Sequence, residues 1–291
     1  MKKKKFRLQL ILSSLAVIAA AIGLIFFGRP QAAADLKVYF FDVGQGDSSY
    51  IKTPIGQDVL IDGGDDNTVL NELGKVMDFS DHEINLVILS HPHSDHLDGL
   101  IEVLKRYKVD EVWETGVAYP SGGYDTWEKE IADKKIPRKI VVAGDEKDFG
   151  DVKLTILYPL SSIEGKTFDN LNNASIINRL DYKNFSVLYT GDAEKDTEQK
   201  VLNPPAGGNL YATVLKVPHH GSENGLMEDF LKVVRPAIAI ISVSQNNKFG
   251  HPNQSTLNLL KDFAVRVYRT DQNGRIEVDS DGEDYWVKTS K

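Results

Sequence analysis

The 291-residue sequence contains no cysteine, so the chain has neither disulfide bonds nor a thiol nucleophile, and it cannot be a lipoprotein anchored through cysteine. It also lacks the Gly-x-Ser-x-Gly pattern of many serine hydrolases and the Gly-x-x-x-x-Gly-Lys pattern of phosphate-binding loops. Low-complexity stretches and short repeats are missing too, which excludes a solenoid. Stability must therefore come from a hydrophobic core, with or without a bound metal.

Acidic residues are missing only from the beginning of the chain. Lys2 to Lys5 and Arg7 precede an uncharged apolar run at residues 8–27, and small residues follow at 31–34. This is the pattern of a secretory signal, but a run of about 20 apolar residues is also long enough to span a bilayer. We therefore expect residues 1–34 to be a signal peptide or an N-terminal membrane anchor. Residues 35–291 would then form a domain that is secreted or held outside the cytoplasm, touching the membrane only through this segment.

The distribution of charge limits the range of partners. All 42 acidic residues but only 28 basic residues lie from residue 35 onward, so this part carries a net charge of −14. Such a charge repels a polyanion such as DNA at long range, although a local basic groove or a bound metal would offset the repulsion. Nothing in the sequence indicates a protein partner.

Apolar segments typical of strands and helices alternate through residues 35–291. The continuous apolar run at 86–90 indicates a strand buried on both faces, and residues 97–107 have apolar positions at helical spacing. Further strands are predicted at 36–43, 59–62, 152–158, 186–190, 213–217 and 237–243, and further helices at 67–77, 193–202, 227–234 and 255–263. The stretch at 116–135 is the least regular and either shapes access to a site or is a surface excursion. The alternation predicts an α/β fold of layered sheets covered by helices.

The most informative feature is a cluster of histidines. Three of the seven lie in His91-Pro92-His93-Ser94-Asp95-His96, directly after a predicted buried strand and before a helix. Because side chains alternate along an extended chain, His91 and His93 point the same way, while Asp95 and His96 lie where the helix begins. One pair can hold one metal ion and the other pair a second. Imidazole and carboxylate ligands indicate zinc, with manganese or iron as alternatives.

Further ligands are expected at the ends of other strands, where α/β proteins gather their site residues. Asp192 follows the strand at 186–190 and is placed to bridge two metals. His219 and His220 follow the strand at 213–217, and one of them is expected to be a ligand and the other a hydrogen-bonding or catalytic group. His251 either reaches a substrate phosphate or is an ordinary loop residue.

These motifs resemble those of the metallo-β-lactamase superfamily, namely His91-x-His93-x-Asp95-His96, Gly191-Asp192 and His219-His220. Within that superfamily the sequence is similar to the hydrolase domain of the ComEC-type competence proteins. This similarity rests on residues 41–48, 215–222, 249–252 and 269–274, so it covers nearly all of the chain from 36 to 278. The resemblance implies a four-layer αβ/βα sandwich with metal ions at one edge.

One histidine that the superfamily usually supplies is missing, because no histidine occurs from residue 97 to 218. The stretch Asn172-Asn173-Ala174-Ser175 lies about where that ligand would fall, with Asn173 as the candidate, so an asparagine oxygen or a water would have to complete the position. We therefore expect two unequal metal sites. The firm site consists of Asp95, His96, Asp192 and His220, and the weaker one of His91, His93 and Asp192.

Several other polar residues are candidates for supporting roles. The resemblance suggests that Asp62 supports the histidine loop. Asp42 and the turn that contains Gln45 and Asp47 either have ordinary turn chemistry or contact the substrate. Ser222 either donates a hydrogen bond to the substrate or caps the helix that follows.

Together these residues predict metal-assisted hydrolysis. A metal ion lowers the pKa of its bound water, so that hydroxide is available near neutral pH. Asp95 would orient the attacking oxygen, and His219 or His251 would stabilise developing charge or protonate the leaving group. The ComEC resemblance implies a phosphodiester substrate, either DNA or, as a rival, a cell-wall polymer such as teichoic acid. A lactamase-type or lactonase-type hydrolase and a non-catalytic metal-binding protein are the remaining alternatives.

Overall fold

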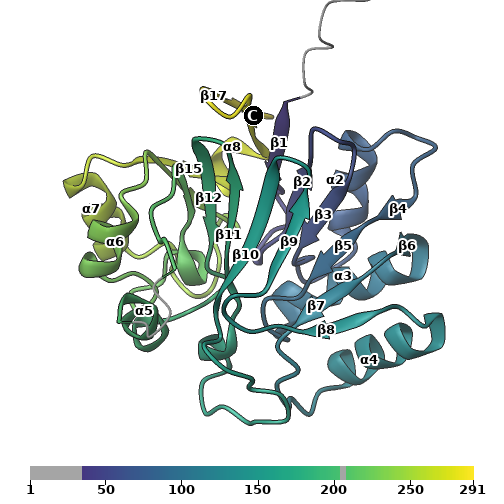
Figure 1. Ribbon diagram of the computed structural model, residues 1–291. Coiled ribbons are helices and arrows are strands. Elements are labelled where there is room, and N and C mark those ends of the chain that lie inside the picture. Colours follow the sequence, from purple (N-terminus) through teal and green to yellow (C-terminus); the bar gives the residue numbers. More distant parts are fainter. Residues whose placement is uncertain (1–34, 204–207) are drawn as a thin grey trace, which may run out of the picture. The chain divides into compact units, whose positions relative to one another are not determined.

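Two mixed β-sheets pack face to face in the computed structural model, which describes residues 35–203 and 208–291 (Figure 1). The first sheet has the order β17-β16-β1-β2-β3-β5-β7-β8 and the second the order β15-β14-β13-β12-β11-β10-β9. The strands of the first sheet are β1 (Leu36–Phe40), β2 (Ser49–Lys52), β3 (Asp58–Ile61), β5 (Leu86–Ile88), β7 (Val112–Glu114), β8 (Arg138–Ile140), β16 (Ile276–Ser280) and β17 (Tyr285–Thr289). Those of the second are β9 (Glu146–Phe149), β10 (Val152–Tyr158), β11 (Ile177–Tyr182), β12 (Phe185–Tyr189), β13 (Val214–Lys216), β14 (Ile238–Ile241) and β15 (Arg266–Arg269).

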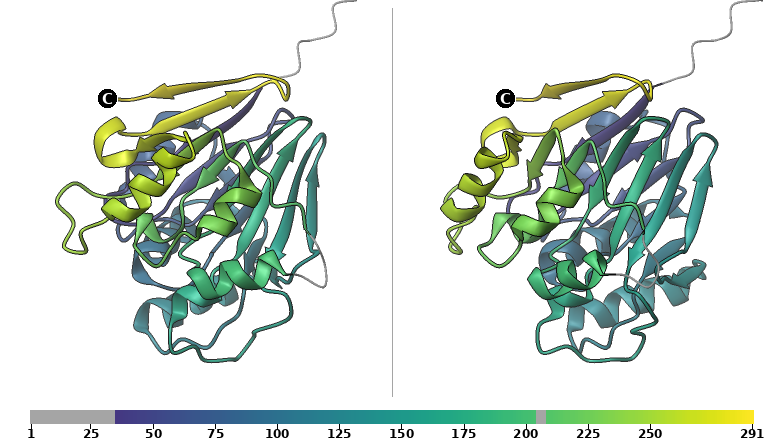
Figure 2. Two further views of the ribbon diagram at one scale, coloured as in Figure 1. Left: turned by 90° about the vertical axis from the view of Figure 1, so that its left-hand side faces the viewer. Right: turned by 60° about the vertical axis from the view of Figure 1, so that its left-hand side comes forward.

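Helices cover the outer side of each sheet, so the described residues form the expected four-layer αβ/βα sandwich (Figure 1). On the first sheet lie α2 (Thr68–Val76), α3 (Ser94–Arg106) and α4 (Gly122–Lys134), and on the second α5 (Lys195–Leu202), α6 (Glu228–Val234) and α7 (Gln254–Asp262). The short elements are β4 (Glu83–Ile84), β6 (Lys108–Val109), η1 (Leu171–Ala174), η2 (Pro218–Gly221) and α8 (Thr270–Asn273). The hairpin of β16 and β17, yellow in Figure 2, completes the first sheet beside β1.

The alternation of side chains along the strands explains the layers. In β1, Val38 and Phe40 belong to the core between the two sheets, whereas Tyr39 belongs to the core under the helices. In β12, Val187 faces the other sheet and Leu188 faces the second set of helices. Because a central strand is covered on both faces, its apolar residues need not alternate with polar ones, as in the continuous apolar run Leu86–Ile88 of β5.

The predicted irregularity of residues 116–135 was wrong, because most of this stretch is the helix α4. The alternative that the stretch shapes access to a site agrees with the structure, since Tyr119, Ser121 and Gly123 line a cavity. The Ser121 hydroxyl accepts a hydrogen bond from the backbone N–H of Tyr124 and caps the helix. Apolar residues recur at helical spacing in α4, and they are buried in the core between the first sheet and its helices: Tyr124, Trp127 and Ile131. The pair Gly122 and Gly123 at the start of the helix concealed it in the sequence, because glycine disfavours helix.

The ends of parallel strands gather the polar side chains of interest. Strands β3, β5 and β7 are parallel neighbours in one sheet, and β12, β13 and β14 in the other. Asp62 follows β3, the loop 91–96 follows β5, Asp192 follows β12 and His220 follows β13. Their side chains meet between the two sheets at this edge.

In the two described ranges, no helix has the length and apolar character that a bilayer span requires. The predicted signal peptide or anchor at residues 1–34 lies outside the described residues.

Candidate metal centre

The histidine loop enters the site through the first turn of α3. This helix begins at Ser94, and His93 precedes it with an extended backbone. His91 and His96 are fully buried, whereas the Asp95 side chain is 27% exposed. The carboxylate of Asp95 lies at the positive end of the helix dipole, which stabilises its charge.

Four side chains from both sheets converge at the centre of the site. Asp95, His96, Asp192 and His220 each place one potential ligand atom within 4.8 Å of the others. The Nε2 atom of His96 lies 3.3 Å from Oδ1 of Asp192. The Nε2 atom of His220 lies 3.4 Å from Oδ2 of Asp192 and 3.3 Å from Oδ2 of Asp95. Asp192 therefore stands between the two imidazoles, and its role as a bridge between two metal ions stays a prediction.

The arrangement of these atoms is explained better by a bound metal ion than by hydrogen bonds among the four side chains. Nε2 of His96, Nε2 of His220 and Oδ1 of Asp192 are buried, and none has a hydrogen-bond partner among the described residues. Orphaned buried polar atoms are rare in folded proteins because each costs free energy. Two imidazole nitrogens and two carboxylates aimed at one point are a donor set for a divalent metal ion.

Asp62 fixes the ring of His96 from the opposite side. Its Oδ2 lies 2.9 Å from Nδ1 of His96, and the same carboxylate accepts hydrogen bonds from the backbone N–H and the hydroxyl of Ser90. Burial alone would lower the pKa of His96, but the charges of Asp192 and Asp62 hold this pKa well above its usual value. The imidazole is therefore oriented by one carboxylate toward another.

A second buried group fixes His220. Its Nδ1 lies 2.9 Å from the carbonyl oxygen of Ser242 and 3.3 Å from Oδ1 of Asp47. The other oxygen of Asp47 pairs with the buried ammonium group of Lys216 at 2.5 Å. Burial opposes ionisation of Asp47, yet Lys216 and His220 keep the pKa of Asp47 below its usual value. Asp47 is thus part of the site and not an ordinary turn residue.

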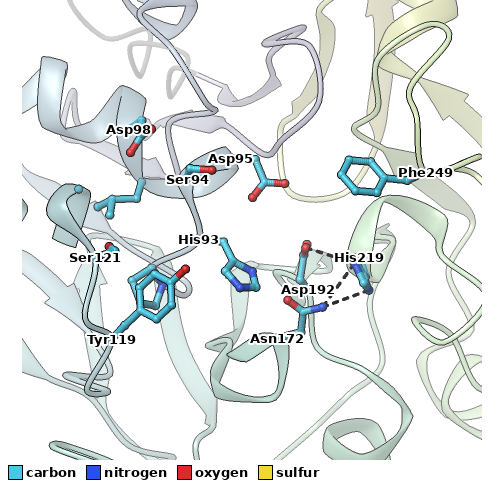
Figure 3. Close-up of a pocket in the computed structure, with 13 residues that line it drawn as sticks. His93, Ser94, Asp95, Asp98, Tyr119, Ser121, Asn172, Asp192, His219 and Phe249 are labelled. Carbon is cyan, nitrogen blue, oxygen red and sulfur yellow. Dashed lines mark hydrogen bonds and ion pairs between the residues drawn. The ribbon is translucent and has the colours of Figure 1, made fainter. Parts of the chain in front are cut away.

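His219 lies on the wall of the cavity, beside Asp192 of the four-residue cluster (Figure 3). Its Nδ1 lies 3.2 Å from Oε1 of Glu194 and 3.1 Å from the hydroxyl of Ser222. Its Nε2 is 3.9 Å from Oδ2 of Asp192. Positive φ values of 48° and 51° at His219 and His220 turn the two neighbouring rings in different directions. This geometry places His220 among the potential ligands and His219 beside the reaction space.

His91 and His93 lie side by side, as the alternation of side chains predicted. The Nε2 atom of His91 is 2.9 Å from Nδ1 of His93, and its ring centre is 4.2 Å from that of His96. Burial lowers the pKa of both, so they are neutral imidazoles that can accept a metal. Among the described residues, no cluster of three closely spaced ligand atoms includes either histidine. The predicted inequality of the two metal positions agrees with this geometry.

Two residues predicted at the site lie elsewhere. The Asn173 side chain accepts a hydrogen bond from Thr197 at 2.9 Å, whereas its neighbour Asn172 lines the cavity. Side chains turn by about 120° per residue in a 3₁₀ helix such as η1, so the two asparagines diverge. Asp42 is turned outward and pairs with Lys291 at 2.8 Å.

The remaining candidates line or support the cavity. Gln45 accepts a hydrogen bond from the backbone of Ser244 and lines a cavity next to Asp95. Ser222 caps no helix, because α6 begins only at Glu228. The His251 ring centre lies 5.4 Å from that of His219. Burial, together with the charges of His219 and His220, lowers the pKa of His251 to about 4, so this ring is neutral at neutral pH.

Two cavities open over the cluster. One, of about 460 Å³, is bounded by His93, Asp95, Tyr119, His219 and Phe249 (Figure 3). The other, of about 390 Å³, lies on the far side of Asp95 and Phe249. The cluster is therefore accessible to a substrate from a recess with two arms.

Lys216 and Glu194 beside the site were missed in the sequence, and Asn172 was considered only as part of the stretch that contains Asn173. Asn172 donates one hydrogen bond to Glu194, and Glu194 in turn contacts His219. Lys216 is buried in an otherwise apolar strand, which is unusual for lysine and was a usable signal. Glu194 had no comparable signal, because a glutamate just before a helix is common on protein surfaces.

Comparison with known proteins agrees with the fold and the motifs. The sequence profile of the Metallo-beta-lactamase superfamily matches residues 41–245. ComE operon protein 3 of Bacillus subtilis (strain 168) is 33% identical over 89% of this chain and 35% of its own length. Competence protein ComA of Neisseria gonorrhoeae is 27% identical over 86% of this chain and 33% of its own. The chain thus spans about a third of the length of these relatives.

Solved structures with little sequence identity share the fold. Tm1679, described as a metal-dependent hydrolase of the beta-lactamase superfamily, superposes with a TM-score of 0.55 at 14% identity, covering 82% of this chain and 98% of its own. The metallo-beta-lactamase fold protein YhfI of Bacillus subtilis gives 0.53 at 13% identity, covering 80% and 96%. With its His91–His96 motif, its paired sheets and the profile match over most of its length, the chain belongs to the metallo-beta-lactamase superfamily.

Proposed function

We propose that this protein is a metal-dependent phosphodiesterase that cleaves nucleic acid outside the cytoplasm. The observation that carries the proposal is the convergence of Asp95, His96, Asp192 and His220 beneath an open cavity. The buried ligand atoms of His96, Asp192 and His220 have no hydrogen-bond partner within the described ranges. The relatives named for competence and recombination favour nucleic acid as the substrate. The basic and apolar segment at residues 1–34 favours a location outside the cytoplasm.

The four converging residues would hold one metal ion, and His91 with His93 would contribute to a second, weaker site. Zinc or manganese bound there supplies Lewis-acid polarisation of a phosphoryl oxygen and a lowered pKa for bound water. The protein contributes orientation, because Asp62 and Asp47 fix the two imidazole rings from behind.

Asp95 and His219 are the side chains that face the reaction space. Asp95 is the more exposed of the two carboxylates of the cluster and is placed to orient an attacking water. Glu194 lies at Nδ1 of His219, so the other nitrogen of that ring faces the cavity. From there His219 can donate a proton or a hydrogen bond to the oxygen that leaves phosphorus.

The test is turnover by the full chain loaded with zinc or manganese. The substrates are a single-stranded oligonucleotide, bis-p-nitrophenyl phosphate, a glycerol phosphate polymer and a β-lactam. We expect hydrolysis of the first two, and loss of that hydrolysis in Asp95→Asn. If the chain hydrolyses only the β-lactam or only the glycerol phosphate polymer, the proposed nucleic-acid substrate is wrong. If it hydrolyses none of the four compounds, the proposed activity is wrong.

A further inference from the structure

The apolar ring of Phe249 is exposed to solvent where the two cavities meet. Its side chain is 56% exposed, yet it bounds both the cavity of about 460 Å³ and that of about 390 Å³. A single exposed apolar residue is ordinary on a protein surface. The position of this one is not ordinary, since it faces Asp95 across the mouth of the metal centre (Figure 3).

The loop that carries Phe249 is tightly fixed. The Asn247 side-chain oxygen accepts hydrogen bonds from the backbone N–H groups of Phe249 and His251, at 3.2 and 3.0 Å. Its amide group donates to the carbonyl oxygens of Ser244 and His251, at 3.1 and 2.6 Å. The ring of Phe249 also stacks on that of His251, with centres 5.8 Å apart and planes 18° apart. A ligand that contacts this ring meets a surface that is already ordered, so little conformational entropy is lost on binding.

A single positive charge stands beside the ring. The Nζ atom of Lys248 lies 5.1 Å from the centre of the Phe249 ring and lines the second cavity. Among the described residues that line the two cavities, Lys248 is the only lysine or arginine, and the others that carry charge are Asp65, Asp95, Asp98 and Asp192. Apart from the metal centre, the recess can therefore attract an anionic group at one place, which is next to an aromatic ring.

We infer that Phe249 is a stacking platform for the nucleobase next to the scissile phosphodiester, and that Lys248 pairs with the adjoining phosphate. A planar ring and a neighbouring anion at fixed spacing are what a single nucleic-acid strand presents. A glycerol phosphate polymer has the phosphates but no planar group, so Phe249 would give it no advantage. This inference rests on the proposed function and names two residues that select the substrate.

Binding to the metal-free full chain separates this inference from the question of activity. The probes are a thymidine oligonucleotide with one 2-aminopurine, whose fluorescence falls on stacking, and an abasic oligonucleotide of equal length. Phe249→Ala should weaken binding of the first probe roughly 5- to 150-fold and abolish the quenching, with little effect on the abasic probe. Phe249→Trp should retain the preference. Phe79→Ala is the matched control, because Phe79 is 99% exposed and lines neither of the two cavities.

Substitutions of Phe249 and Lys248 should affect oligonucleotide binding differently, since the first should change the preference for a base and the second the dependence on salt. Lys248→Met should weaken both probes alike and lower the slope of log affinity against log salt by about one unit. Lys261→Met, which alters an exposed lysine in the last turn of α7, should change neither quantity.

The outcomes distinguish the inference from the proposed function. A base preference that depends on Phe249 in a chain that hydrolyses no ester would uphold the platform and overturn the phosphodiesterase. Equal effects of Phe249→Ala on base-containing and abasic probes, or no binding of either probe, would overturn the platform, whether or not the chain is active. A glycerol phosphate polymer that binds as tightly as the oligonucleotide, with the same sensitivity to Phe249→Ala, would overturn it as well.

Discussion

The Oδ2 atom of Asp62 lies 2.9 Å from Nδ1 of His96, so a carboxylate that follows β3 fixes an imidazole in the first turn of α3. Both side chains are buried. The opposite nitrogen of the ring is thereby directed at Asp192. Partners that orient a metal-binding histidine in this way typically change metal affinity by roughly 10- to 100-fold.

Asp62→Asn should therefore weaken metal binding by about that factor while the chain stays folded. Asparagine tolerates the left-handed backbone of residue 62, where φ is 58°, so the backbone need not change. Zinc affinity is measured by calorimetry with a competing chelator. Asp78→Asn, at a side chain that is 86% exposed, is the control and should bind zinc like the unaltered chain. Unchanged affinity in Asp62→Asn would contradict a role for Asp62 in orienting His96.

His219→Asn and His220→Asn should both lower turnover, but only His220→Asn should lower metal affinity. His220 lies within the four-residue cluster, so its loss should lower metal affinity and turnover together. His219 contacts Glu194 and Ser222 on the cavity wall, so its loss should lower turnover by roughly 10²- to 10⁴-fold and leave the metal content unchanged. Both positions have positive φ, which asparagine accepts. Metal content by mass spectrometry and turnover of bis-p-nitrophenyl phosphate decide the matter, and a metal-free His219→Asn would reverse the assignment.

The sequence was sufficient for the parts of the site that follow from strand ends. Asp192 and the histidine loop each come directly after an apolar strand, so their positions at strand ends were predictable. These strands, β12 and β5, lie in different sheets, and the resemblance to the superfamily predicted that their ends meet. The side-by-side arrangement of His91 and His93 followed from the alternation of an extended chain.

The sequence was insufficient where the direction of a side chain depends on one or two backbone angles. Asn172 and Asn173 differ by one step of a 3₁₀ helix, and only the first reaches the cavity. The left-handed backbone of His219 and His220 decides which of the two rings joins the four-residue cluster, and no local sequence pattern predicts that backbone conformation. The pairing of Asp42 with Lys291 joins residues 249 positions apart, so only the folded chain reveals it.

Gly99→Ala should destabilise the protein, because the backbone of α3 at residue 99 packs directly against the backbone of the loop that follows β3. A Cβ atom at residue 99 would lie 1.9 Å from the carbonyl oxygen of Gly63, which is rigid backbone. Relieving this overlap should lower the free energy of unfolding by about 1–3 kcal/mol or more. Gly74→Ala in α2 is the matched control, since nothing lies within 4 Å of its Cβ, and alanine there should raise the free energy of unfolding by about 0.5–1 kcal/mol. Urea denaturation measures both, and equal effects would contradict the argument.

The stability of the metal-free protein should also depend on pH through Asp58. This residue begins β3, at the end of the strand opposite to Asp62 and the metal centre. Asp58 is only 3% exposed, and burial raises the pKa of its carboxyl group to about 6. The carboxyl group has a pKa of about 3.9 in the unfolded chain, so the folded chain binds this proton more tightly. The contribution of Asp58 to the free energy of unfolding is therefore largest below about pH 4 and falls as the pH rises through 6.

Asp58→Asn cannot ionise and should lose this dependence. At pH 7.5 the free energy of unfolding of the variant should exceed that of the unaltered chain by about 1 kcal/mol, a value below the full shift because the protein around a buried carboxylate relaxes and admits water when the group ionises. At pH 4 the two should differ little, since Asp58 is then protonated when folded. Urea denaturation at pH 4, 5, 6 and 7.5 in the presence of a chelator gives the comparison, with Asp229→Asn, at a side chain that is 70% exposed in α6, as the control. A difference between variant and unaltered chain that stays constant over this range would show that Asp58 does not titrate near pH 6.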